Sequence, residues 1–226
     1  MIKLEGVSKT YPGGFTVLEN VNLVFGDGEF VSIIGQTGAG KSTLLKLIYA
    51  EEQPTKGTVY FNDRPLENIN RKYLPFYRRN IGTVFQDFKL LPQKTVFENI
   101  AYALEVDGES DDDIFVKVGK IMKIFGIWDM ADKYPRQLSG GEQQKVSLAR
   151  AMVHSPKVII ADEPTGNLDP VSTWEIIQLL LKINTMGTTV ILATHNKGIV
   201  DKIKKRVIVM EKGMVVSDIE QGKYAC

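Results

Sequence analysis

The 226-residue sequence contains little cysteine, no long apolar run and almost no net charge. Its only cysteine is the last residue, Cys226, so no disulfide can form within the chain and a reducing compartment is expected. No apolar run approaches the roughly 18–20 residues that cross a bilayer, and the first residues, MIKLEGVSKTYPGG, lack the apolar core of a secretion signal. The formal net charge is +1, so no overall field attracts nucleic acid and no nucleic-acid partner is expected. These absences predict a soluble intracellular protein.

Short apolar segments alternate with amphipathic ones along most of the chain. Two strands joined by the turn Pro12-Gly13-Gly14 are expected first, and the later strands are EFVSIIG, GTVYFND, IGTVFQ, KVIIAD, TTVILAT, RVIVME and MVVSD. Helices are expected at 41–50, 96–106, 111–125, 171–186 and 197–203, with a short basic helix at 71–79 that is interrupted near Pro75. Alternating strands and helices indicate an α/β fold with a parallel sheet, here with a largely helical insertion at about 87–156.

The segment GQTGAGKS, residues 35–42, fits the phosphate-binding loop pattern G-x-x-x-x-G-K-[ST] in full. It follows an apolar run that suits a buried strand and precedes a helical segment, which is the context that the motif requires. Its glycines let successive backbone N–H groups face one anion at the positive end of a helix. Lys41 can bridge the β- and γ-phosphates of a nucleotide, the Ser42 hydroxyl can bind Mg²⁺, and Thr43 is placed to contact the α-phosphate.

The segment VIIADE, residues 158–163, is an apolar strand that ends in two acids. Beside a phosphate-binding loop, Asp162 would hold the metal through its water shell, and Glu163 would orient and deprotonate an attacking water. A carboxylate pair at a strand end is common, so the motif is informative only in combination with the loop. Together the two motifs predict hydrolysis of a nucleoside triphosphate, with charge neutralisation at the γ-phosphate.

The segment LSGGEQQ, residues 138–144, has the pattern of a helix start. Ser139 and Glu142 stand three residues apart, so the hydroxyl can accept from a free backbone N–H and the carboxylate can reach back. A cap of this kind needs only one of the two glycines, Gly140 and Gly141. The second glycine indicates that something approaches the backbone very closely.

In order and content these motifs resemble those of ABC-type ATPases, and the resemblance covers nearly the whole chain. LSGGEQQKVSLARA resembles the signature sequence of that family, and VIIADEPTGNLD resembles its second acidic motif. Tyr11 takes the place of the aromatic residue that stacks on adenine, Gln86 that of a glutamine that senses Mg²⁺ and the γ-phosphate, and His195 that of a histidine that contacts the γ-phosphate. Taken alone, the same three residues suit an edge-strand aromatic, a strand-end cap and a core or capping histidine.

The resemblance implies one P-loop NTPase domain of the ABC ATPase type over residues 1–226. Its mainly parallel, RecA-like core would span about 1–86 and 157–226, with an N-terminal antiparallel β subdomain and a helical signature subdomain at about 87–156. ATP and Mg²⁺ are the implied cofactors. The implied catalytic residues are Glu163, His195, Lys41 and Gln86, and the implied metal-binding residues are Ser42, Gln86 and, through water, Asp162. The implied nucleotide-binding residues are Tyr11, Gly35, Gln36, Thr37, Gly38, Ala39, Gly40, Lys41, Ser42, Thr43 and Gln86.

The resemblance also implies a homodimer in the ATP-bound state. In the family two subunits lie head to tail, and each phosphate-binding loop faces the Ser-Gly-Gly of the other copy. Ser139 and the amides of Gly140 and Gly141 would therefore bind the γ-phosphate that the partner copy holds. Two ATP molecules would hold the dimer together and hydrolysis would release it. Asn167–Asp169 resembles the loop that makes further dimer contacts.

A membrane partner is implied as well, because the chain itself has no run that could span a bilayer. The loop from Gln86 to Leu91 would accept a short helix of that integral membrane protein. The chain would then be peripheral, at the cytoplasmic face of the inner (plasma) membrane. The cations of segment 71–79 leave two interpretations open, a contact with phospholipid or acidic partner residues and an ordinary solvated face.

Within the family, FQDFKLLPQKTVFENIAYALEV, ADEPTGNLDP and INTMGTTVILATHN are most similar to the bacterial cell-division ATPases. Those ATPases act with a membrane protein that controls peptidoglycan hydrolases outside the cell. Asn196 after His195, and the residues 87–89 after Gln86, favour this branch. Lipoprotein-release and macrolide-export ATPases share SGGEQQ and ADEPTGNLD and remain an alternative. A nucleotide-gated recruiting module, in which hydrolysis is incidental, is a second alternative.

Overall fold

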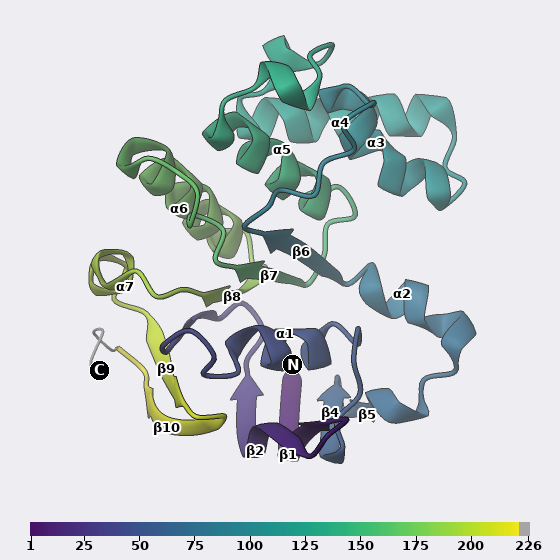
Figure 1. The fold of residues 1–226 in the computed structure, drawn as a ribbon. Helices are drawn as coiled ribbons and strands as arrows, with labels where there is room; N and C mark the ends of the chain where they lie inside the picture. Colours follow the sequence, from purple (N-terminus) through teal and green to yellow (C-terminus); the bar gives the residue numbers. More distant parts are fainter. Residues whose placement is uncertain (222–226) are drawn as a thin grey trace.

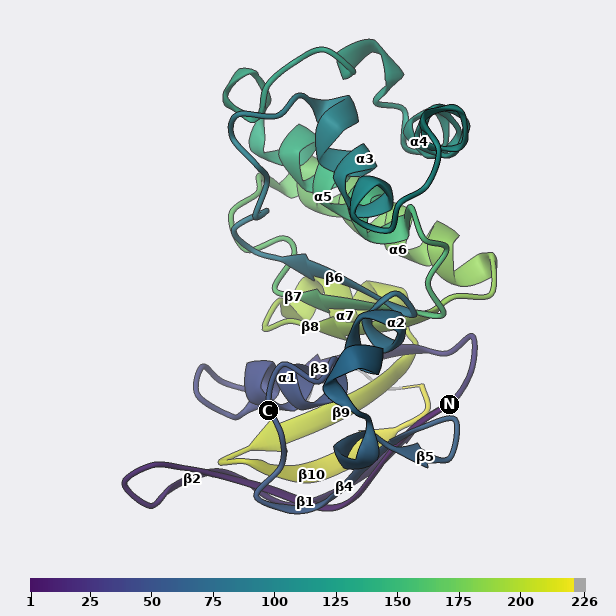
Figure 2. The same ribbon diagram turned by 90° about the vertical axis from the view of Figure 1, so that its right-hand side faces the viewer.

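The structure, a computed structural model, describes residues 1–221, apart from the side chain of Asn68. Cys226, on which the expectation about disulfides rests, lies outside these residues. The described chain forms two sheets and a group of helices (Figures 1 and 2). No helix within residues 1–221 is both long and apolar enough to cross a membrane.

The N-terminal part of the chain forms an antiparallel sheet with the strand order β2-β1-β4-β5. Its strands are β1 (Ile2–Tyr11), β2 (Phe15–Phe25), β4 (Lys56–Phe61) and β5 (Arg64–Pro65). The predicted turn after Tyr11 joins the first two strands, and the prediction of an N-terminal antiparallel sheet is confirmed.

The second sheet has six strands in the order β10-β9-β3-β8-β7-β6. All of them are parallel except β10, which pairs antiparallel with β9. The strands β3 and β8 are buried throughout, as expected for the centre of a parallel sheet that is covered on both faces. The bounds are β3 (Phe30–Ile34), β6 (Ile81–Phe85), β7 (Val158–Asp162), β8 (Thr189–Ala193), β9 (Arg206–Glu211) and β10 (Met214–Ile219).

The register of the parallel strands decides where the sequence motifs meet. Phe85 pairs with Asp162, Asp162 pairs with Ala193, and Ala193 pairs with Ile33. Four strands therefore end abreast at one edge of the sheet. The segments that follow them contain Gln86, Glu163, His195 and the phosphate-binding loop, so one edge collects all of these motifs.

The helices cover the parallel sheet and form a separate group beyond β6, where Figure 1 shows α3, α4 and α5 together. The α-helices are α1 (Lys41–Ile48), α2 (Leu74–Arg78), α3 (Val96–Val106), α4 (Asp111–Phe125), α5 (Gly140–Met152), α6 (Pro170–Thr185) and α7 (Lys197–Ile203). Four short 3₁₀ turns are η1 (Leu66–Asn68), η2 (Arg71–Tyr73), η3 (Trp128–Met130) and η4 (Pro135–Gln137).

Most predicted helices and strands are confirmed, and the differences have local causes. Helix α1 ends at Ile48, two residues before the predicted end. Pro75 does not interrupt a helix but stands in the first turn of α2, where its missing N–H costs no hydrogen bond. The two-residue strand β5 and the 3₁₀ turns were not predicted, because segments of two or three residues have no hydrophobic period.

Two buried clusters occupy opposite faces of the parallel sheet. Alternate residues of a strand point to opposite faces. Ile159 accordingly belongs to the cluster shared with α3 to α6, while Ile160 belongs to the cluster shared with α1 and the antiparallel sheet. The helical group therefore has no core separate from the sheet, and its boundaries at about 87 and 156 remain a prediction.

Candidate nucleotide-binding and catalytic site

The phosphate-binding loop runs from the end of β3 to the first residue of α1. Gly40 caps the helix in a left-handed conformation (φ 98°), and Gly38 also has a positive φ. The Lys41 ammonium donates to the carbonyl oxygens of Gly35, at 2.7 Å, and Gln36, at 3.2 Å. The lysine is buried in the curl of the loop, and the first turn of α1 contains no acidic residue. The loop therefore presents a cation and free helix N–H groups together, which suits a polyphosphate.

Glu163 lies next to this cation, directly after the last residue of β7. Its Oε1 atom is 4.0 Å from Lys41 Nζ and 2.9 Å from His195 Nδ1. A carboxylate only accepts hydrogen bonds, so a proton on His195 Nδ1 would complete this contact and leave Nε2 for another one. Glu163 has a left-handed backbone (φ 48°), which is uncommon for a residue other than glycine and is typical of functional positions. Its N–H donates to the Ala193 carbonyl oxygen, which secures this conformation.

Asp162 ends β7 and is half-buried. Burial raises the pKa of its carboxyl group, a hydrogen bond to the Ser42 side chain opposes that rise, and the nearby Glu163 charge adds to it. Its Oδ1 atom is buried and has no hydrogen-bond partner among the described residues. An unsatisfied carboxylate oxygen beside a hydroxyl is a fitting pair of ligands for a hard cation such as Mg²⁺. Within residues 1–221 no cluster of three or more acidic, histidine or cysteine side chains could hold a metal without a substrate.

Gln86 closes the same site from the end of β6. Its Nε2 donates to Asn167 Oδ1 at 3.0 Å, and Asn167 Nδ2 donates back to the Gln86 carbonyl oxygen at 3.3 Å. A cavity of about 390 Å³ is lined by Ser42, Gln86, Asp162, Glu163 and Asn167, among others. The structure thus brings together the predicted metal-binding and catalytic side chains. A second cavity, of about 280 Å³, lies along the loop residues Gln36, Thr37, Gly38 and Ala39.

Tyr11 lies at the end of β1 and pairs with Phe15 of β2, whereas the pairing of β1 with β4 ends at Ser8. Its hydroxyl donates to Glu52 Oε1 at 2.8 Å, and the Lys9 ammonium lies 5.1 Å from its ring centroid. Lys9 also pairs with Glu52 at 3.1 Å. The ring is therefore held from two sides. Glu52 was not identified from the sequence, because it belongs to no motif and lies far from Tyr11 along the chain.

The predicted cap at the start of α5 is confirmed. Ser139 Oγ accepts from the Glu142 N–H, and the Glu142 carboxylate accepts from the Ser139 N–H, which lowers the pKa of Glu142. The close neighbour that the second glycine indicated lies within the same chain. A Cβ atom at Gly141 would be 2.7 Å from Oγ and 2.8 Å from Cβ of Ser172 in α6.

The signature residues and the phosphate-binding loop are not brought together within one chain. Neither of the two cavities beside the loop is lined by Ser139, Gly140 or Gly141 in the described structure. A Cβ at Gly140 would instead meet Leu168 at 3.3 Å and Phe88 at 3.7 Å. Within the described residues, the signature segment therefore lies against the loop of Asn167 and Leu168 and lines neither cavity.

Two further residues that sequence analysis missed connect the helical group to the site. Gln144 is completely buried, and its amide donates to the carbonyl oxygens of Phe85, at 3.2 Å, and Pro164, at 2.7 Å. Arg150 donates to the carbonyl oxygens of Phe88 and Lys89, two consecutive residues with positive φ. The only signal for both was a polar residue in a helix, which ordinarily indicates a solvated face.

Comparisons with known proteins agree with the motifs. Residues 18–166 match the family model described as "ABC transporter". The chain is 52% identical over 224 residues to the "Cell division ATP-binding protein FtsE" of Bacillus subtilis (strain 168), covering 99% of this chain and 98% of that protein. It is 42% identical over 213 residues to the protein of the same name from Escherichia coli (strain K12), covering 94% and 96%.

Solved structures give the same result for the fold. A dimeric ATP-binding cassette in a post-hydrolysis state, bound to ADP and Pi, is 36% identical, with a TM-score of 0.88 and coverage of 99% and 100%. CbiO1 of Clostridium perfringens, part of an ABC transporter complex, is 33% identical, with a TM-score of 0.90 and coverage of 97% and 88%. The predicted fold class is confirmed by these neighbours and by the two sheets. The chain therefore belongs to the ABC transporter family and is one of its ATPase cassettes.

Proposed function

We propose that this chain is the ATP-hydrolysing subunit of a bacterial cell-division complex and that it works as an ATP-dependent homodimer. The observation that carries the proposal is the placement of Glu163 beside Lys41 and His195, at the same sheet edge as Asp162 and Gln86. Relatives from both Bacillus and Escherichia have the name of cell-division ATP-binding protein, and this supports the assignment.

The residues of the site divide the work of hydrolysis. Lys41 would bind the β- and γ-phosphates, so its hydrogen bonds to Gly35 and Gln36 would be exchanged for phosphate oxygens. Glu163 would accept a proton from the attacking water, and Gln86 would orient that water and the γ-phosphate. His195, with Nδ1 turned to Glu163, would direct Nε2 to the γ-phosphate. Tyr11 would stack on the adenine.

A bound Mg²⁺ would neutralise charge on the β- and γ-phosphates. The Ser42 hydroxyl and Asp162, the latter through water, would hold it, with Gln86 nearby. The buried, unpartnered Oδ1 of Asp162 supports this assignment. The remaining nucleotide-binding residues would be the loop residues 35–40 and Thr43.

The second half of each site would come from a second copy of the chain. Ser139, Gly140 and Gly141 do not line the site of their own chain, although their family resemblance assigns them to the γ-phosphate. A dimeric cassette among the structural neighbours supports the pairing of two copies, and the head-to-tail arrangement follows from the family resemblance. In such a pair ATP binding would close the dimer and hydrolysis would open it.

The variant Glu163→Gln tests this proposal. It keeps the hydrogen bond to His195 possible but cannot accept a proton, so we expect it to bind Mg·ATP and to remain a stable dimer in gel filtration. The wild-type chain should return to monomer as ATP is consumed, and Lys41→Ala should stay monomeric because it lacks the phosphate ligand. A monomeric Glu163→Gln chain at saturating Mg·ATP would contradict the proposal.

We further propose that an FtsX-like integral membrane protein docks near Gln86–Leu91 and places the chain at the cytoplasmic face of the inner membrane. The backbone of this loop is held by Arg150, so movement of the helical group would be passed to the docking loop. Co-purification of the membrane partner with this chain from solubilised membranes tests the proposal. The docking contact near Gln86–Leu91 would depend on the nucleotide state of the chain. The names of the relatives do not favour the lipoprotein-release or macrolide-export alternatives, and the assembled catalytic groups do not favour a recruiting module.

A further inference from the structure

A cavity of about 890 Å³ lies outside the site described above, at the edge of the molecule. It is lined by the end of β4, by β5, by residues between Ile69 and Tyr77 and by Asn80 and Lys157, and Figure 1 shows α2 of this segment beside β6. None of the lining residues belongs to the nucleotide site or to the loop from Gln86 to Leu91. Segment 71–79, whose cations take no part in the nucleotide site, forms one wall.

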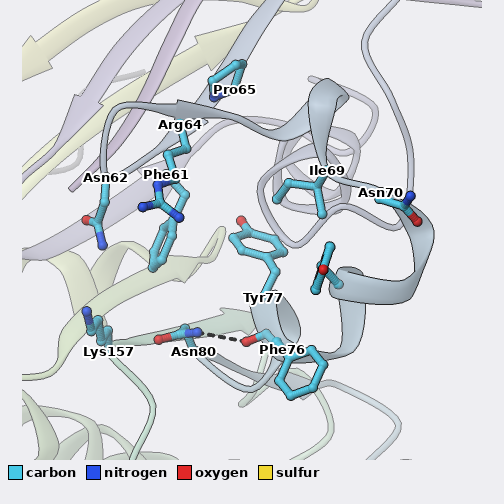
Figure 3. A pocket seen from close by; sticks show the side chains of 11 residues that line it. Phe61, Asn62, Arg64, Pro65, Ile69, Asn70, Phe76, Tyr77, Asn80 and Lys157 are labelled. Atoms are coloured by element: carbon cyan, nitrogen blue, oxygen red, sulfur yellow. Dashed lines mark hydrogen bonds between the residues drawn. The ribbon is translucent and has the colours of Figure 1, made fainter.

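The inner wall of this cavity is aromatic and the rim is basic. Figure 3 shows Phe61 and Tyr77 side by side at the inner wall. Their rings pack edge to face, with 5.2 Å between the ring centroids. The side chains of Arg64 and Lys157 are the charged groups among the lining residues, and both are exposed. Neither forms an ion pair with any carboxylate in residues 1–221. The two acids in the same part of the chain, Asp63 and Glu67, do not line the cavity.

Two more cations stand next to lining residues in the sequence. Arg71 and Lys72 lie between Asn70 and Tyr73, which both line the cavity, and both are exposed. The remaining cations of the segment are engaged elsewhere, because Arg78 donates to the Ala50 carbonyl oxygen and Arg79 pairs with Asp107. Two cations therefore line the cavity, Arg71 and Lys72 neighbour lining residues in the sequence, and the Lys72 ammonium lies 4.9 Å from the ring centroid of Tyr73.

The exposed aromatic residues on the same wall narrow the choice of ligand. Tyr73 is 54% exposed and Phe76 is 56% exposed, although both line an apolar cavity. Aromatic rings beside cations are characteristic of segments that lie at a membrane–water interface. A free phosphate would leave the aromatic wall unused. An extended acidic peptide could not pair along β5, because that strand is two residues long and contains Pro65, which has no N–H to donate.

We propose that this cavity and its basic rim bind anionic phospholipid at the membrane surface. The phosphate of one lipid would lie among Arg64, Lys157, Arg71 and Lys72, and its glycerol and upper acyl carbons would contact the aromatic wall. The contact goes beyond the proposed function, because it needs no membrane protein and no nucleotide. It would hold the chain at the bilayer by a face other than the loop that is proposed to dock the membrane partner.

Vesicle flotation with the full, nucleotide-free chain tests the proposal. The vesicles contain either phosphatidylcholine alone or phosphatidylcholine with 30 mol% phosphatidylglycerol, and we expect binding only to the second. Each cation near an anionic surface changes the partition coefficient by roughly fivefold, so Arg71→Ala/Lys72→Ala and Arg64→Ala/Lys157→Ala should each lose roughly 25-fold. Binding should also weaken as salt is raised.

Two matched variants separate the cavity from general charge. Asn70→Asp is isosteric and can still accept from the Lys72 N–H as the native side chain does, yet it adds a negative charge to the lining, so it should weaken vesicle binding at least fivefold. Lys120→Ala/Lys182→Ala removes two exposed cations from α4 and α6 and should bind like the wild type.

Three results would overturn the proposal. They are equal binding to the two vesicle types, an equal loss in the rim variants and in Lys120→Ala/Lys182→Ala, and capture of a labelled poly-glutamate peptide without any capture of anionic vesicles. The last result would identify an acidic protein partner instead. Retained ATP-dependent dimerisation of Glu163→Gln in the rim variants would show that the variant chains are folded, and it would leave the proposed ATPase function intact whichever vesicle result is obtained.

Discussion

Replacing Gly141 by alanine tests whether the second signature glycine is required by packing within the chain. The new Cβ would be 2.8 Å from Ser172 Cβ and 2.7 Å from its Oγ. Rotation of Ser172 can move Oγ but not Cβ, so one helix has to shift. Overpacking of this kind costs about 1–3 kcal/mol, and the better helix propensity of alanine returns about 1 kcal/mol at most.

The net loss in the free energy of unfolding should be about 1–2 kcal/mol, which lowers the melting temperature of a chain of this size by about 2–8 °C. Thermal and urea unfolding of the nucleotide-free chain measure it. Gly119→Ala is the matched control, because Gly119 is also a buried helical glycine but a Cβ there would meet only Trp128, at 3.4 Å. That variant should be neutral or more stable by about 0.5–1 kcal/mol. The argument fails if Gly141→Ala melts at or above the wild-type temperature.

Three further predictions concern the site. Because burial raises the pKa of Asp162, ionisation of its carboxyl group favours the unfolded chain, and the free energy of unfolding falls as pH rises through the folded-state pKa. Asp162→Asn should therefore raise the melting temperature of the nucleotide-free chain at pH 7. This gain should become smaller toward pH 4. Tyr11→Phe should weaken ATP binding several-fold by calorimetry, because it removes the hydrogen bond from the Tyr11 hydroxyl to Glu52 that helps to hold the ring. Ser139→Ala should cost about 1 kcal/mol in urea unfolding through the lost cap.

The parts of the structure that could be predicted are those that depend on short sequence patterns. The strand before the phosphate-binding loop, the strand that ends at Asp162 and the helix that starts after Ser139 each have a periodicity or a cap. The proximity of the catalytic groups could be predicted because the carboxyl ends of parallel strands lie at one edge of the sheet. The strand register, in which Asp162 pairs with Ala193, then determines how far apart the groups that follow these strands lie.

The contacts that could not be predicted join segments that are far apart in the chain. Glu52 binds Tyr11, and Gln144 reaches the carbonyl oxygens of Phe85 and Pro164. A polar side chain in a helix has no local mark that separates a solvated position from a buried one. Only the packing of α5 against the ends of β6 and β7 makes Gln144 an internal ligand of the backbone. The aromatic cavity beside α2 has the same origin, because Phe61 and Tyr77 belong to different elements.

Gly141 has two possible roles, and a compensating change distinguishes them. If the glycine serves packing alone, Ser172→Gly in the Gly141→Ala chain removes the clash, so the double variant should regain the ATP-dependent dimer and melt at the temperature of Ser172→Gly alone. If its amide also lies against the partner's γ-phosphate, stability should return while the dimer still needs more ATP to form, since the added methyl group stays next to that amide in both variants. Gel filtration of both chains in the Glu163→Gln background gives the answer, because hydrolysis is then removed. A double variant that regains stability and dimerises at the ATP concentration of its parent would assign this glycine to packing against Ser172.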